Sequence, residues 1–123
     1  DIAIIACGSM VHNALEASKL LKNKQIQSTV IDMHTIKPVD EKALDEISKD
    51  FKFIVTVEEH NVIGGLGSAV AEYISGISLS PPLLKIGIED SYGDAGDYQT
   101  LLNKKKLMPH QIFELILAKF HSI

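Results

Sequence analysis

The feature that most limits how this chain can fold is a fourfold alternation of apolar, strand-length runs with segments of helical spacing. The apolar runs are rich in β-branched residues and span residues 2–7, 26–33, 51–59 and 83–89. They are nearly continuous, which is typical of strands that are buried on both faces of a sheet. The pattern therefore predicts one α/β domain over residues 1–123, with three α/β/α layers and a mostly parallel, roughly five-stranded sheet.

The segments between these runs place apolar residues three and four positions apart, which predicts amphipathic helices. Ser9 is expected to cap the first helix and Asp40 the second, because their side-chain oxygens can accept bonds from free N–H groups. Pro109 suits the first position of the last helix. The inner face of the first helix is predicted to comprise Val11, Ala14, Leu15, Ser18 and Leu21.

Composition excludes several classes of function. The chain has 123 residues, of which 46% are hydrophobic, and a net charge of −4. The only basic cluster, Lys104–Lys106, is expected to be a solvated helix end, so no nucleic-acid partner is predicted. No apolar run approaches the ~20 residues that span a bilayer, so no membrane partner is predicted either.

The single cysteine, Cys7, excludes an internal disulfide and fits a reducing compartment, so a cytoplasmic location is predicted. Its apolar surroundings in sequence predict a small buried side chain. The chain begins at Asp1 rather than Met, and we expect it to be an excised domain or a processed piece of a longer protein.

The stretch from Val55 to Tyr73 admits two interpretations. Glycines before a helix can bring a phosphate to the free N–H groups and the positive end of the helix dipole. This makes Gly64, Gly65, Gly67 and Ser68 a candidate anion-binding turn. Alternatively, the same glycines let the helix start pack tightly against neighbouring backbone, in this domain or in another chain.

A dinucleotide loop is matched only in part. Val70 stands where the third glycine of G-x-G-x-x-G belongs, four residues separate the strand from the glycines, and the strand is the third of the chain. Glu89 and Asp90 lie near the spacing of a ribose-binding acid. A nucleotide-binding α/β domain of an oxidoreductase therefore stays open as an alternative function.

Acidic residues and a histidine precede that turn. Glu58, Glu59 and His60 end the third apolar run, at the edge where α/β proteins place their sites. His60 could be an acid–base group or could fix the turn through a carboxylate. Asp90, Asp94 and Asp97 do not match a calcium loop and no histidine pair has zinc-ligand spacing, so no metal site is predicted.

Five segments, in order, resemble the C-terminal domain of the transketolase family. They are "AIIACGSMVHNALEASKLL", "VIDMHTIKPVDEKAL", "IVTVEEHNVIGGLGSAVAEYI", "IGIEDSYGDAG" and "LMPHQI". The resemblance covers the whole chain and is greatest to the separate C-terminal section of a split transketolase. Deoxyxylulose-phosphate synthase and the β subunits of 2-oxoacid dehydrogenases have similar domains. The chain departs from the family pattern at Ala95, Lys106 and Met108, and Met108 forgoes a side-chain cap on the last helix.

The resemblance implies a non-catalytic assembly domain. In the family, thiamine diphosphate and Mg²⁺ lie between two other domains, so no catalytic, cofactor-binding or metal residue is assigned to this chain. The implied partner is the N-terminal catalytic section or domain, with a homodimeric or hetero-oligomeric contact. The chain alone is expected to be inactive, whereas the complete transketolase moves a two-carbon ketol unit between sugar phosphates.

Overall fold

Four parallel strands form the middle layer of the molecule, in the order β2-β1-β3-β4. The computed structural model describes residues 1–34, 39–61, 65–88 and 107–123, apart from the side chains of residues 60, 61 and 88. The strands are β1 (Ile2–Ala6), β2 (Ser28–Asp32), β3 (Phe53–Asn61) and β4 (Leu83–Ile88). All three pairings are parallel, with Ile4 of β1 opposite Val30 and Val55.

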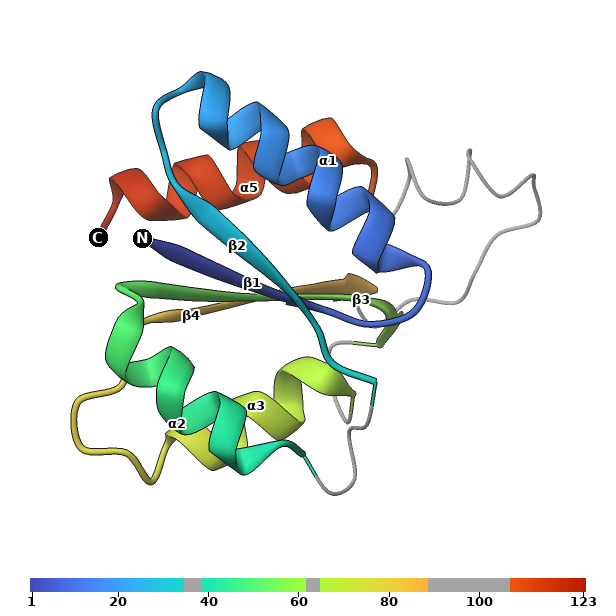
Figure 1. Ribbon diagram of the computed structural model, residues 1–123. Helices are drawn as coiled ribbons and strands as arrows, with labels where there is room; N and C mark the ends of the chain where they lie inside the picture. The colour runs from blue at the N-terminus through green and yellow to red at the C-terminus, as the bar shows by residue number, and fades with distance from the viewer. Residues whose placement is uncertain (35–38, 62–64, 89–106) are drawn as a thin grey trace.

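Helices cover both faces of this sheet (Figure 1). Helices α1 (Met10–Asn23) and α5 (Pro109–His121) lie together on one face, and α2 (Glu41–Asp50) and α3 (Leu66–Ile74) lie on the other. The predicted three-layer α/β/α fold with a parallel sheet is therefore confirmed. The described residues contain four strands, where the sequence predicted roughly five. None of the described helices is long and apolar enough to cross a membrane.

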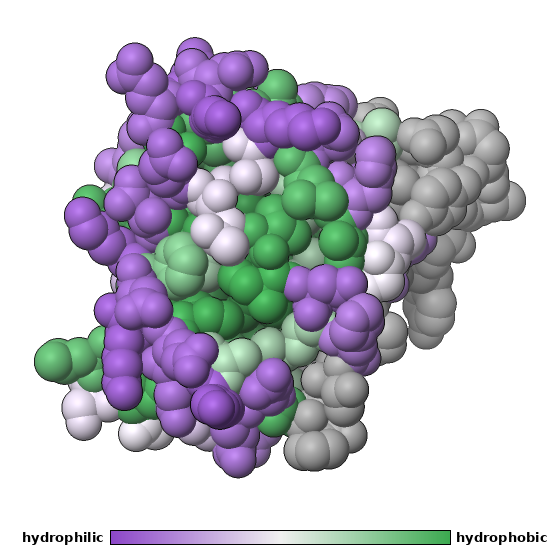
Figure 2. Space-filling view, in the orientation of Figure 1, coloured by the Kyte–Doolittle hydropathy of each residue, from purple (hydrophilic) through white to green (hydrophobic). Residues whose placement is uncertain are grey.

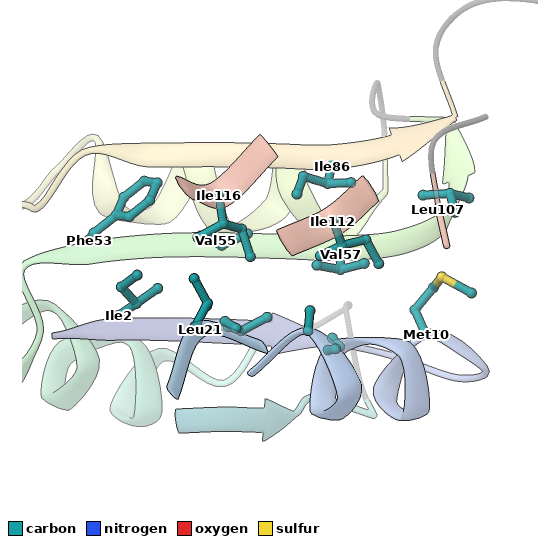
Figure 3. Packing of buried hydrophobic residues seen from close by; sticks show 14 of the residues in the cluster. Ile2, Met10, Leu21, Phe53, Val55, Val57, Ile86, Leu107, Ile112 and Ile116 are labelled. Atoms are coloured by element: carbon teal, nitrogen blue, oxygen red, sulfur yellow. The ribbon is translucent and has the colours of Figure 1, made fainter. Parts of the chain in front are cut away.

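The side-chain alternation along β3 divides the core into two clusters. Phe53, Val55 and Val57 face α1 and α5, where Ile112 and Ile116 pack over them (Figure 3). Intervening positions face α2 and α3, and the cluster there comprises Ala3, Ile5, Met33, Leu44, Ile47, Ile54, Leu66, Val70 and Ile74. The same alternation places Glu58 on the α3 side, because it lies an even number of positions from Ile54.

The predicted inner face of α1 was partly wrong. Leu15 is 47% exposed, and the buried residues are Met10, Asn13, Ala14, Ala17 and Leu21. The helix begins with Met10 already buried, which turns the inner face away from Leu15. Asn13 is buried because its side-chain amide donates to the carbonyl oxygen of Leu107 at 2.8 Å.

The two predicted N-caps have different outcomes. The Asp40 carboxylate accepts from the N–H of Ala43 at 3.0 Å, so this cap is confirmed. The Ser9 cap is wrong, because Ser9 has a helical backbone and its side chain makes no cap bond. Pro109 begins α5 as predicted, and the side chain of Gln111 accepts from the N–H of Met108 at 3.2 Å.

Replacing Asp40 by Ala should lower the free energy of unfolding by about 1 kcal/mol, because an N–H at the start of α2 loses its acceptor. Asp40→Asn keeps a side-chain oxygen and should lose much less. Urea denaturation of the three proteins measures both values. Equal stability of Asp40→Ala and the parent chain would contradict the assigned cap.

Candidate functional site

The carboxyl ends of the strands bring polar side chains from three segments to one edge of the sheet. Asp32 ends β2, Cys7 follows β1, and Glu58 and Glu59 lie in the last part of β3. Because β1, β2 and β3 are neighbouring parallel strands, these ends point the same way. This is the edge at which open α/β sheets place their sites.

Glu58 is the most constrained residue of this edge. Its side chain is only 1% exposed. One carboxylate oxygen accepts from the N–H of Leu66 at 2.8 Å, and the other accepts from the N–H of Gly67 at 2.7 Å. The first two residues of α3 thus donate to a carboxylate from the strand that precedes them. This pair of short, charge-assisted bonds ties the start of α3 to the end of β3.

This arrangement decides what the start of α3 can bind. A helix N-terminus attracts an anion through its free N–H groups and the positive end of its dipole. Here Glu58 supplies the negative charge and uses the first two N–H groups. A phosphate at the same place would have to displace a buried carboxylate or lie beside it. The geometry therefore disfavours a phosphate loop at Gly65–Ser68.

Gly67 serves close packing of α3 on the sheet. A Cβ atom at this position would lie 2.9 Å from Thr56 Oγ1 and 2.9 Å from Lys85 Cγ, which is closer than real contacts allow. Thr56 is fully buried in β3, so the helix start rests directly on that strand. The atoms that approach Gly67 belong to side chains of β3 and β4, whereas the sequence analysis predicted close packing against backbone.

A second contact joins the turn after β1 to the end of β3. The hydroxyl of Ser9, which does not cap α1, donates to a carboxylate oxygen of Glu59 at 2.6 Å. Both residues are exposed, so this bond lies on the surface of the edge.

Cys7 lies half-buried at the same edge, as an unpaired thiol. Burial raises the pKa of the Cys7 thiol, and the negative charges of Glu58 and Asp32 raise it further. A raised pKa keeps the group as a thiol rather than a reactive thiolate at neutral pH. Cys7 is therefore a poor nucleophile. The predicted burial of its side chain was only partly right, because Cys7 follows the last residue of β1 and is half-buried.

The structure thus brings together Glu58, Gly65 and Gly67, with Ser68 in the first turn of α3 and Glu59 on the next position of β3. The side chain of His60, the whole of Gly64, and the acids at 90, 94 and 97 lie outside the described residues, as do Glu89 and Lys104–Lys106. Among the described residues, no three His, Cys, Asp or Glu side chains are grouped so as to bind a metal ion.

Sequence reasoning missed the bonds that organise this edge. The alternation of β3 was visible, and it places Glu58 beneath the following helix. The carboxylate-to-backbone contact also requires the distance between the strand end and the helix start, which the sequence does not supply. The bond between Ser9 and Glu59 joins residues 50 positions apart and had no local signal.

Comparisons with family models and with curated proteins point to the same family. Residues 1–112 match the family described as "Transketolase, C-terminal domain". A protein of Methanocaldococcus jannaschii named "Putative transketolase C-terminal section" is 48% identical over 97% of this chain and 37% of its own length. The 1-deoxy-D-xylulose-5-phosphate synthase of Caldanaerobacter subterraneus subsp. tengcongensis is 34% identical over 99% of this chain and 20% of its own length.

Solved structures agree. The structure titled "Split gene transketolase, inactive beta4 tetramer" superposes with a TM-score of 0.86 and 39% identity, over 96% of this chain and 37% of that one. A transketolase from Campylobacter jejuni has the same fold, with a TM-score of 0.69 at 17% identity, over 95% of this chain and 16% of that one. The chain therefore spans well under half the length of these relatives.

Replacing Glu58 by Gln should lower the free energy of unfolding by about 2 kcal/mol, because the amide has one acceptor atom for two N–H groups and no charge. Glu59→Gln is the matched control, since the exposed Glu59 side chain should lose little. Denaturant unfolding measures both values, and amide hydrogen exchange at Leu66 and Gly67 reports where α3 loosens. A Glu58→Gln protein with unchanged stability and exchange would contradict the assigned contact.

Proposed function

The chain belongs to the transketolase C-terminal domain family, and from that membership we propose that it is the non-catalytic assembly domain of a thiamine diphosphate-dependent transketolase. The complete enzyme transfers a two-carbon ketol unit between sugar phosphates. The chain spans 37% of the length of the transketolase section that it resembles, and we place the cofactor site in the part of the assembly that this chain does not cover. By itself the chain is inactive.

The observation that supports this proposal most is the bidentate contact between Glu58 and the start of α3. A diphosphate needs free N–H groups or a metal ion, and the start of α3 already donates to a carboxylate. The described residues also lack a group of side chains that could bind Mg²⁺. The start of α3 is therefore a poor place for a diphosphate, and no catalytic step is assigned to it.

The carboxyl edge is the surface that we assign to assembly. Glu58 and Gly67 fix its shape, and Glu59 and Ser9 lie exposed on it. The exposed carboxylate of Glu59 suits contact with a protein surface of opposite charge. The proposed partner is the N-terminal catalytic section of the enzyme, or a second copy of this domain within the assembly.

Three alternatives follow from the comparisons and the sequence. The similarity to 1-deoxy-D-xylulose-5-phosphate synthase supports an equivalent assembly domain in that enzyme, and the 2-oxoacid dehydrogenase β subunit is a further alternative of the same kind. A nucleotide-binding oxidoreductase domain rested on the glycine turn, and the position of the Glu58 carboxylate disfavours it.

The test compares the isolated 123-residue chain with the complete transketolase assembly that contains it. The isolated chain should show no ketol transfer and no change of Tm with thiamine diphosphate and Mg²⁺, NAD⁺, NADP⁺ or AMP, whereas the assembly should be active. A ligand at about 100 times its Kd adds ~2.7 kcal/mol, which would raise the Tm by roughly 10 °C. A shift of that size with a dinucleotide would overturn the proposal.

In the assembly, Glu59→Lys should weaken subunit association about tenfold or more, because it reverses a charge on the proposed contact edge. Glu46→Lys makes the same change on the exposed side of α2 and should leave association unchanged. Sedimentation velocity of the assembly measures both effects. Equal behaviour of the two variants would remove the carboxyl edge from the interface.

A further inference from the structure

We draw no further inference here: the strongest candidate, the hydrophobic surface patch beside strand β2 in the middle of the face that Figure 2 shows, carries none, because nothing in the structure shows what covers it.

Discussion

The contact between the Glu58 carboxylate and the N–H groups of Leu66 and Gly67 fixes the geometry on which the rest of this edge depends. It satisfies two backbone donors that a helix leaves without intrahelical partners, and it gives a buried carboxylate two strong bonds. Glu58 lies in the last part of β3. The contact therefore fixes the position of the first turn of α3 relative to the sheet. Gly67 makes that position possible, since any side chain there would meet Thr56.

This geometry gives the glycine turn a structural role. A glycine-rich turn before a helix is the usual feature of a phosphate site, and the sequence alone left that function open. In this chain the negative charge at the helix start comes from the protein itself. The same residues that would approach a phosphate instead bring α3 against the sheet. The carboxyl edge is thereby a shaped protein surface, which is why we assign it to assembly rather than to chemistry.

Much of the fold was predictable because it depends on local patterns. Continuous β-rich runs predicted the four described strands to within two residues at each end, and Asp40 and Pro109 marked the starts of α2 and α5. The inner face of α1 was misplaced because the burial of Met10 and Asn13 depends on contacts with distant segments. Ser9 has the right side chain for a cap, yet its backbone is already helical and its hydroxyl donates to the carboxylate of Glu59. The position of α3 on β3 likewise could not be predicted, because it depends on tertiary contacts of Glu58 and Gly67.

The most direct measurement is a titration of the 123-residue chain with inorganic pyrophosphate, followed by the amide resonances of Leu66, Gly67 and Ser68 in ¹H–¹⁵N spectra. If Glu58 occupies the start of α3, these resonances should not shift in a saturable way. A saturable shift centred on Gly67 would mean that an anion can displace the carboxylate, and it would contradict the structural role of the turn.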